Sequence, residues 1–318
     1  MMVVKPPTCT NSQFNEDSSE VAAAPTCPFA DKKCVGTCAE YRYGRVCSCA
    51  AQAAGKAAHE KTLQLLQDSE IFKAKPVFTE INADDLVMGE RIGEGGFSYV
   101  NDCRLKGSDK TFAVKYLKRK IMVDVRNFKH GAADLIAEAF FLGTLDHPNI
   151  VKLHGVTAGN VDTNVSSGKE CGYFILVDKL VETVEQKIVR WRKEEAAQSH
   201  SLLHRLTKEY KEHQKLMIRQ RMQVALDIAK VMEYLHSLNI AFRDLKPDNI
   251  GHDSKGNLKL FDFGLAKEEK ATNRDSMGKY DMTGHTGSRR YMAPEGKLDR
   301  TSLDCVDSCI SIFQRSHH

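Results

Sequence analysis

Three polar residues of different chemical type lie close together in residues 241–249, which read A-F-R-D-L-K-P-D-N. Asp244 supplies a carboxylate, Lys246 an ammonium group and Asn249 an amide. Pro247 lacks a backbone donor and clashes with a preceding helical turn, so we expect a loop here. Such groups suit phosphoryl transfer, because that chemistry requires positioning of the reactants and compensation of the negative charge on the moving phosphate.

The loop resembles the catalytic loop of the eukaryotic protein kinases. That motif reads H-R-D-L-x-x-x-N, and the chain matches it at Arg243, Asp244, Leu245 and Asn249, with Phe242 in place of the histidine. In the family the histidine packs against the phenylalanine of a later D-F-G motif, so we expect an aromatic ring at this position to fill the same volume. A lysine two residues after the aspartate is similar to the serine/threonine subclass.

A D-F-G motif begins at Asp262, downstream of the loop. The resemblance implies a kinase that transfers the γ-phosphate of ATP to serine or threonine hydroxyls of protein substrates, with ATP and Mg²⁺ as cofactors. It implies that Asp244 orients the hydroxyl or accepts its proton and that Lys246 steadies the γ-phosphate. It also implies that Asn249 and Asp262 hold Mg²⁺.

A glycine-rich turn lies between two expected strands near residue 95, which indicates a hairpin and not the strand-to-helix turn of a Rossmann fingerprint. By itself such a turn signifies only a hairpin. Together with the catalytic loop it resembles the kinase loop that covers the phosphates of ATP, with a serine at the third glycine position. The residues that this implies as ATP-binding are Gly93, Glu94, Gly95, Gly96, Phe97, Ser98 and Val100.

Lys115 follows Ala113 and Val114 on the next expected strand, where the family places the lysine that grips the α- and β-phosphates. Apolar residues recur at helical spacing over 132–145, and Glu138 in that stretch is the expected partner of Lys115. The resemblance also implies that Ala113 and Lys115 on this strand bind ATP. The resemblance further implies that the backbone of Asp178 and Leu180 binds adenine.

The expected fold class is α+β, a two-lobed protein kinase fold. Residues 83–318 would form the kinase domain, with a five-stranded small lobe at about 84–179 and a mainly helical large lobe at about 180–318. Within the small lobe, residues 157–169 read as a Gly/Ser/Asn loop. In the large lobe, the charged stretch 182–215 reads as a helix with a solvated extension, or as a partner-binding surface.

A long amphipathic helix is predicted to end at Ser237. Only 23 residues follow Glu295, the end of an A-P-E motif, and they do not match the helices that the family has there. We therefore expect a large lobe that is incomplete at its C-terminal end. Four apolar residues of the long helix would then lack their cover: Val224, Ile228, Met232 and Leu235.

Residues 1–82 are expected to form a cysteine-containing, flexible N-terminal region and linker, with a short helix over 50–67. Six of the chain's ten cysteines lie in its first 49 residues, at Cys9, Cys27, Cys34, Cys38, Cys47 and Cys49. Their spacing lacks the paired C-x₂-C knuckles of a zinc finger. A small zinc or redox module is the alternative, because clustered thiols bind metals and oxidise.

Composition indicates an ordinary globular protein, with 42% hydrophobic and 28% charged residues. A net charge of +4 with scattered Lys and Arg gives no indication of nucleic-acid binding. No apolar run reaches the length of a membrane span, and residues 1–13 lack the core of a signal peptide. We expect no membrane partner and a cytoplasmic location, with the nucleus as an alternative.

The partners implied by the resemblance are a protein substrate and an upstream activating kinase. Thr283 and Thr286 are the expected phosphorylation sites in the activation segment, and Arg243 is the expected partner of the phosphate. The function expected is therefore a protein serine/threonine kinase. The alternative is a catalytically impaired fragment that binds nucleotide or regulates another protein.

Overall fold

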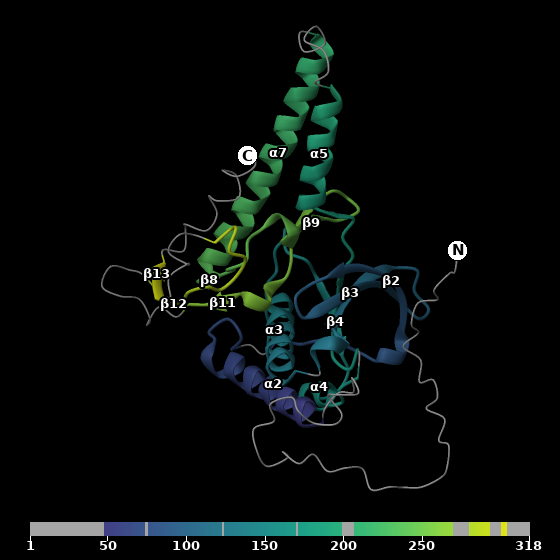
Figure 1. Cartoon of the computed structure of the whole chain (residues 1–318), viewed down its shortest axis with the longest axis vertical. Coiled ribbons are helices and arrows are strands. Elements are labelled where there is room, and N and C mark those ends of the chain that lie inside the picture. The colour runs from purple at the N-terminus through teal and green to yellow at the C-terminus, as the bar shows by residue number, and fades with distance from the viewer. Residues whose placement is uncertain are drawn as a thin grey trace. The chain divides into compact units, whose positions relative to one another are not determined.

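The computed structural model of the chain describes residues 48–73, 76–122, 124–169, 171–198, 207–269, 280–292 and 300–303 (Figure 1). The chain divides into two units. The first contains the described residues up to Asp68, together with Phe72–Gly143 and Leu153–Lys179; the second contains Ser69–Ile71, Thr144–Lys152 and the residues from Leu180 onward. The division after Lys179 coincides with the predicted end of the small lobe.

Three α-helices and six strands, together with the 3₁₀ helices Ala83–Asp85 and Arg119–Ile121, make up the described part of the first unit. The α-helices and strands are α2 (Ser48–Asp68), β1 (Glu80–Ile81), β2 (Leu86–Glu94), β3 (Ser98–Leu105), β4 (Thr111–Leu117), α3 (Val125–Thr144), β5 (Leu153–Thr157), α4 (Val161–Ser166) and β6 (Phe174–Asp178). The strands form one sheet in the order β1-β5-β6-β4-β3-β2. Strands β2 to β6 are the five expected. The two-residue β1, which pairs parallel with β5, is an addition too short to show a sequence period.

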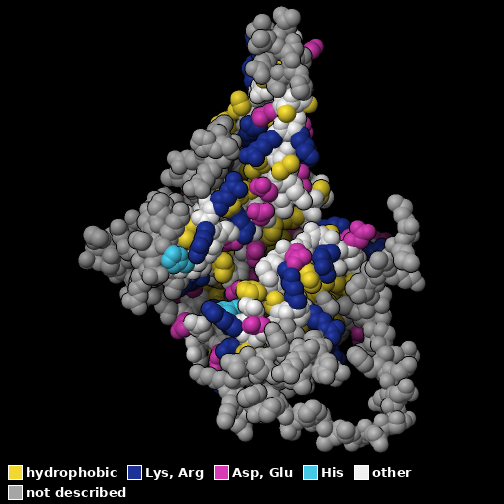
Figure 2. Space-filling view, in the orientation of Figure 1, with side chains coloured by type: hydrophobic (Ala, Val, Ile, Leu, Met, Phe, Trp, Pro, Cys, Tyr) yellow, Lys and Arg dark blue, Asp and Glu magenta, His cyan; other side chains and the backbone are white. Residues whose placement is uncertain are grey.

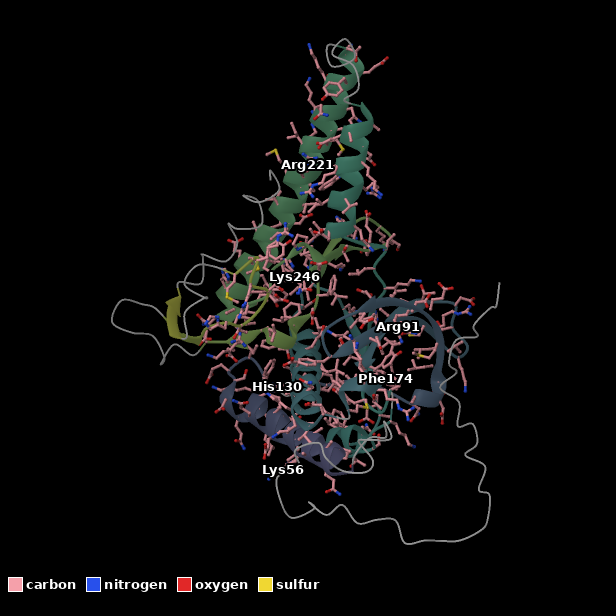
Figure 3. All side chains as sticks on the ribbon, in the orientation of Figure 1. Lys56, Arg91, His130, Phe174, Arg221 and Lys246 are labelled. Carbon is pink, nitrogen blue, oxygen red and sulfur yellow. The ribbon has the colours of Figure 1, made fainter. Side chains whose placement is uncertain are left out.

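The sheet holds together because its strands place apolar side chains on a shared core. The cluster comprises Ile81, Leu86, Cys103, Phe112, Val114, Tyr116, Cys171, Phe174 and Leu176. Phe174, labelled in Figure 3, is fully buried on the strand β6. Burial raises the pKa of the Cys103 thiol to about 12, so this cysteine acts as a packing residue and not as a reactive thiolate.

Helix α3 begins seven residues earlier than the stretch 132–145 that the sequence predicts. Asp124 starts it: its side chain accepts from the backbone N–H of Asn127 at 2.7 Å, and its carbonyl accepts from that of Phe128. The sequence does not predict this first part of the helix, because Gly131 lies within it and glycine has a low helix propensity. A Cβ there would lie 2.8 Å from Ile121 and 2.9 Å from Phe97, so packing selects glycine.

Residues 1–82, for which a flexible N-terminal region and linker stays a prediction, contain helix α2 in their described part. Helix α2 contains the helix expected over 50–67 and buries alanines along one side. It packs on α4, where a Cβ at Gly55 would clash with Ser166 and with the carbonyl of Asp162. Helix α4 also corrects the loop expected over 157–169, since packing on α2 stabilises six residues of weak helical propensity.

Two α-helices and seven strands form the described part of the second unit, together with the 3₁₀ helices Pro247–Asn249 and Phe263–Leu265. The α-helices and strands are β7 (Glu182–Thr183), α5 (Val184–Gln198), α7 (Lys208–Ser237), β8 (Ile240–Ala241), β9 (Ile250–His252), β10 (Leu258–Leu260), β11 (Lys267–Glu268), β12 (Tyr280–Thr283) and β13 (Arg300–Leu303). The strands pair as β10-β9-β7, β11-β8 and β12-β13. The hairpin from β9 to β10 turns at Gly256, which has φ +84°.

Helices α5 and α7 run side by side in the charged stretch where the sequence predicts one helix and an extension (Figure 1). Trp191 joins them: it is buried, and its Nε1 donates to Gln220 at 3.3 Å. Arg221, labelled in Figure 3, pairs with Glu195 at 2.5 Å and lies 5.4 Å from the Trp191 ring. The extension is therefore a packed helical pair with a tryptophan at its centre.

Helix α7 ends at Ser237 as predicted, but its buried face corrects one expectation. Val224, Ile228, Met232 and Leu235, which were expected to lack cover, are all at most 7% exposed. Helix α7 contacts β8 and β10 of the same unit. The exposed apolar side chains of α7 are others: Leu216, Ile218, Met222 and Leu226, each at least half exposed.

On the face shown in Figure 2, Lys and Arg side chains are interspersed with Asp and Glu. No helix in the described ranges is long and apolar enough to cross a membrane. Cys9, Cys27, Cys34, Cys38 and Cys47 lie outside the described residues, as does the side chain of Cys49. The choice between a flexible tail and a zinc or redox module stays a prediction.

His252 on β9 makes stability depend on pH. It is 6% exposed, its Nε2 lies 3.2 Å from the Lys187 ammonium, and its Nδ1 has no partner among the described residues. Burial, and then the charge of Lys187, lower its pKa. In the unfolded chain this histidine has a pKa of about 6.5, so it binds a proton more readily there than in the folded chain. The stabilising contribution is present above that pH and lost as the pH falls.

We expect His252→Gln to reduce the fall in melting temperature between pH 7.5 and pH 5.5, measured by thermal unfolding. His147 and His236, whose pKa values burial also lowers, will leave part of the fall in place. His59→Gln on the exposed surface of α2 is the control and should retain the wild-type slope. A His252→Gln protein with that same slope would contradict the assignment.

Candidate active site

The catalytic loop is organised around the carboxylate of Asp244, which is 8% exposed. Its Oδ2 lies 2.7 Å from the Lys246 ammonium and accepts from the Asn249 side chain at 2.9 Å. Its Oδ1 accepts from the backbone N–H of Ser288 at 2.8 Å. The three residues that the sequence singles out for phosphoryl transfer are thus directly connected, and three donors satisfy a nearly buried charge.

Ser288 and Gly287 bring a distant segment to this loop. The Ser288 hydroxyl is 3.0 Å from the Lys246 ammonium, so the serine contacts both charged groups. Gly287 has φ +98°, and a Cβ there would lie 2.1 Å from the carbonyl oxygen of Arg243. Sequence reasoning assigned no role to Gly287. Its position at the start of the segment G-S-R-R-Y-M-A-P-E, just before Ser288, is the signal that could have revealed it.

The D-F-G segment lies next to the catalytic loop through its backbone. The N–H of Phe261 donates to the carbonyl of Asn249 at 3.0 Å, so Asp262 follows one residue after this contact. Asp262 adopts the left-handed conformation, with φ 69° and ψ 64°, which aspartate tolerates better than most residues. Phe242 contacts Phe263 edge-on, with ring centroids 5.0 Å apart. The expectation that the aromatic ring at 242 packs on the D-F-G phenylalanine is confirmed.

Arg243 also has positive φ, and its Nε donates to the carbonyl of Leu265 at 2.6 Å. This contact holds the turn after Asp262 against the catalytic loop. The expected partner of Arg243, a phosphorylated residue of the activation segment, stays a prediction. Of the two expected sites, Thr286 lies in the described part and its hydroxyl donates to the Gly284 carbonyl, whereas the side chain of Thr283 is outside it.

Lys115 and Glu138 form a second, separate ion pair in the first unit. Lys115 Nζ lies 2.5 Å from Glu138 Oε2, and the side chains are 15% and 4% exposed. Strand β4 places Lys115 opposite Val100 on β3, and helix α3 supplies Glu138. The predicted partnership of these two residues therefore exists in the structure. Ala113 lies on the same strand, opposite Asp102 and Val177.

The predicted phosphate-covering turn is the hairpin between β2 and β3. The N–H of Gly95 donates to the carbonyl of Ser98 at 2.9 Å, which closes the turn over Gly96 and Phe97. Glu94 in this turn accepts from the buried ammonium of Lys118 at 2.5 Å. That hydrogen bond is the main reason why the pKa of Glu94 is lowered. The pairing with Lys118 was not foreseen, because nothing in the local sequence distinguishes that lysine.

The two residues expected to bind adenine lie at the end of β6 and just after it. The side chain of Asp178 accepts from His154 Nε2 at 2.7 Å if that nitrogen carries the proton. The side chain of Leu180 packs on Gly251, where a Cβ would lie 2.8 Å from its Cδ1. By its resemblance to the family, the sequence predicts that Gly251 stands where a bulky apolar residue usually lies beneath adenine. In this chain the leucine occupies the space that such a side chain would need.

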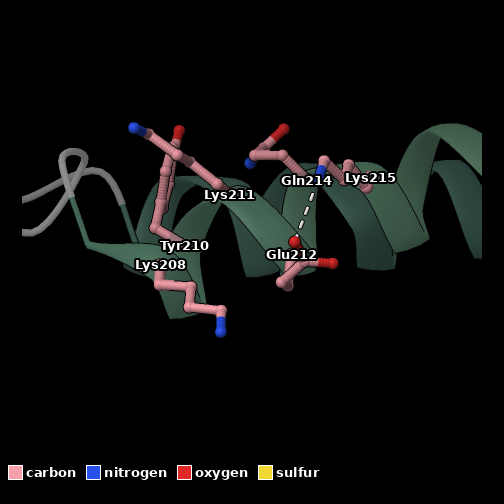
Figure 4. Close-up of a pocket in the computed structure, with 6 residues that line it drawn as sticks. All are labelled: Lys208, Tyr210, Lys211, Glu212, Gln214 and Lys215. Carbon is pink, nitrogen blue, oxygen red and sulfur yellow. Dashed lines mark hydrogen bonds and ion pairs between the residues drawn. The ribbon is translucent and has the colours of Figure 1, made fainter.

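A surface pocket lies near the start of α7 (Figure 4). Its lining consists of Lys208, Tyr210, Lys211, Glu212, Gln214 and Lys215. Lys215 pairs with Glu212 at 2.9 Å within the helix. None of the predicted site residues lines this pocket, so it has no role in the candidate active site. No group of three or more His, Cys, Asp or Glu side chains suited to a metal occurs among the described residues.

Comparison with known proteins places these motifs in a family. The family model described as protein kinase domain matches residues 86–302, more than half of the chain. This chain belongs to the protein kinase family. The α+β architecture, with a sheet-bearing small lobe and a helical large lobe, is the fold class that the sequence predicts.

Similar individual proteins carry kinase names but are much longer. A Dictyostelium discoideum protein named as a probable serine/threonine-protein kinase is 29% identical over 243 residues, which are 76% of this chain and 43% of that protein. Serine/threonine-protein kinase Sgk1-B of Xenopus laevis is 31% identical, over 64% of this chain and 38% of its own length. CBL-interacting protein kinase 21 of Oryza sativa is 28% identical, over 70% and 35%. The chain spans less than half of each relative.

Gly287→Ala should disrupt the contact between Ser288 and Asp244. We expect it to lower the free energy of unfolding by at least about 3 kcal/mol, because the new Cβ meets a fixed carbonyl as well as a strained backbone angle. Gly256→Ala is the matched control: it has φ +84° and nothing within 4 Å of the added Cβ. It should lose only about 1–2 kcal/mol. Equal losses in urea denaturation would show that the Arg243 contact is unimportant.

Proposed function

We propose that this chain catalyses transfer of the γ-phosphate of ATP to serine or threonine hydroxyls of protein substrates. The observation that carries the proposal is the network on Asp244, in which the carboxylate contacts Lys246, Asn249 and Ser288 at 2.7 to 2.9 Å. These groups are the carboxylate, ammonium and amide that positioning of a hydroxyl and of a phosphate requires. Membership of the protein kinase family supports the same activity.

Asp244 would orient the incoming hydroxyl and accept its proton as the phosphoryl group transfers. Lys246 lies against Asp244 and Ser288, so its ammonium can neutralise charge on the γ-phosphate close to the hydroxyl. Lys115, held by Glu138, would grip the non-transferred phosphates. The backbone of residues 93–98 would cover them, because glycine at 93, 95 and 96 allows N–H groups to approach closely.

The residues predicted to hold Mg²⁺ fit that ion. The Asn249 side-chain nitrogen donates to both the carbonyl and the carboxylate of Asp244, which leaves the amide oxygen directed away from these contacts. An amide oxygen of Asn249 and a carboxylate of Asp262 are the hard oxygen ligands that Mg²⁺ prefers. When bound, Mg²⁺ would compensate the charge of the phosphates.

The same proposal includes the partners of the reaction, the binding of adenine and the location of the protein. A protein substrate would present its hydroxyl to Asp244, and an upstream kinase would phosphorylate Thr283 or Thr286. Backbone groups of Asp178 and Leu180 would bind adenine. We propose a cytoplasmic or nuclear location and no membrane or nucleic-acid partner, in line with the mild, scattered charge.

Lys115→Met and Asp262→Asn should each lower phosphate transfer from radiolabelled ATP to a serine/threonine peptide library by at least about a hundredfold. Each removes a charge that the transition state needs. The double variant should be little worse than either single one, because residues of one reaction centre act together. Lys106→Met on the exposed β3–β4 turn is the control and should keep wild-type turnover. Wild-type turnover in either site variant would refute the assignment.

A further inference from the structure

Residues 69–72 follow α2 and precede the part of the chain that matches the kinase family, and we call them the docking segment. Their first three residues bind the carboxylate of Glu268. The Ser69 hydroxyl donates to Glu268 Oε2, while the N–H groups of Glu70 and Ile71 donate to Oε1 at 3.0 and 3.3 Å. Three donors on one ionised carboxylate make a strong polar contact between positions 199 apart in sequence.

Glu268 lies on β11, four residues after the glycine of the D-F-G motif. Strand β11 pairs with β8, with Lys267 opposite Ala241 and Glu268 opposite Ile240. The N–H of Glu269 extends this ladder to the carbonyl of Asn239. The next residue after β8 is Phe242, the start of the catalytic loop. The docking segment therefore binds the short ladder that joins the end of the D-F-G segment to the beginning of the catalytic loop.

The fourth residue of the docking segment packs on α3. Phe72 is 1% exposed, and its ring lies edge-on at 5.5 Å from Phe140 and 5.2 Å from Phe141. Phe78 adds a further contact with Phe140 at 5.4 Å. Phe140 and Phe141 lie on the turn of α3 that follows Glu138. Such aromatic packing fixes the position and rotation of a helix, because each ring buries a large area in a defined geometry.

A terminal extension that merely shields apolar surface would account for Phe72 but not for the contact with Glu268. The three hydrogen bonds to the Glu268 carboxylate are directional, and they are lost if the backbone of residues 70 and 71 moves. One contact involves α3, which carries Glu138, and the other involves β11, which follows the D-F-G segment. One peptide bond connects Ile71 to Phe72. The segment is thus suited to fixing both elements.

We propose that the docking segment is a positioning element for the reaction described above. Phe72 holds α3 so that Glu138 stays paired with Lys115. Glu268, bound by residues 69–71, holds β11 so that the turn carrying Asp262 keeps its conformation. This inference rests on the proposed kinase function for its consequence in catalysis, but the two contacts are measurable without any activity.

The test uses the full chain and two measurements, hydrogen exchange and phosphate transfer to a serine/threonine peptide library. Phe72→Ala should speed exchange of α3 amides about tenfold, and Glu268→Ala should do the same for β8 and β11, with β2 and β3 unchanged in both. The rate at saturating ATP should fall about tenfold with a smaller change in KM for ATP, because misplaced groups affect the transition state more than binding. Phe72→Leu should restore most of the slow exchange of α3 and most of the rate that Phe72→Ala loses.

Val77→Ala is the control. Val77 lies five residues after the docking segment, its side chain is 96% exposed, and the variant should match the wild type. Wild-type exchange in α3 and β11 of both variants would overturn the proposal, as would faster exchange spread evenly over all strands, which indicates general destabilisation. A wild-type chain that transfers no phosphate would refute the proposed function alone, since the exchange measurement still decides whether the docking segment fixes α3 and β11.

Discussion

The second unit depends on satisfying the nearly buried carboxylate of Asp244. An ionised group at 8% exposure is costly unless donors surround it, and here the donors come from the ammonium of Lys246, the amide of Asn249 and the backbone of Ser288. Two of these lie in the same loop. The third comes from 44 residues along the chain and reaches Asp244 only because Gly287 allows the backbone to pass the Arg243 carbonyl. The carboxylate that would orient the substrate therefore also organises the segment beside it.

The first unit has a comparable requirement at Lys115 and Glu138. The lysine is fixed by a strand that is paired on both sides, whereas the glutamate depends on the position of one helix. Aromatic side chains of α3 are covered by Phe72 and Phe78, which precede the residues that match the kinase family. A buried ion pair is very sensitive to small displacements, because its two charges have lost their hydration and are stabilised mainly by each other. Packing outside the family region thus supports a contact inside it.

Much of the candidate site could be predicted from the sequence, because its chemistry is encoded locally. Asp244, Lys246 and Asn249 lie within nine residues, and the loop expected there contains only a three-residue 3₁₀ helix, Pro247–Asn249, whose first position suits proline. The pairing of Lys115 with Glu138 and the contact of Phe242 with Phe263 were also expected, on the strength of family motifs. Helix α7 ends where its apolar period ends. In each case a short pattern determines either the backbone or the identity of the partner.

Only the tertiary structure decided which apolar faces are covered and which distant residues meet. Val224 and Ile228 were expected to be uncovered, yet both are buried, and α7 contacts β8 and β10. Helix α4 and strand β1 are too short for a sequence period and exist because α2 and β5 pack against them. The contact of Ser69 with Glu268 spans 199 positions. The sequence determined the reactive groups and the local backbone, because these follow from neighbouring residues; long-range burial and hydrogen bonding depend on how the whole chain folds.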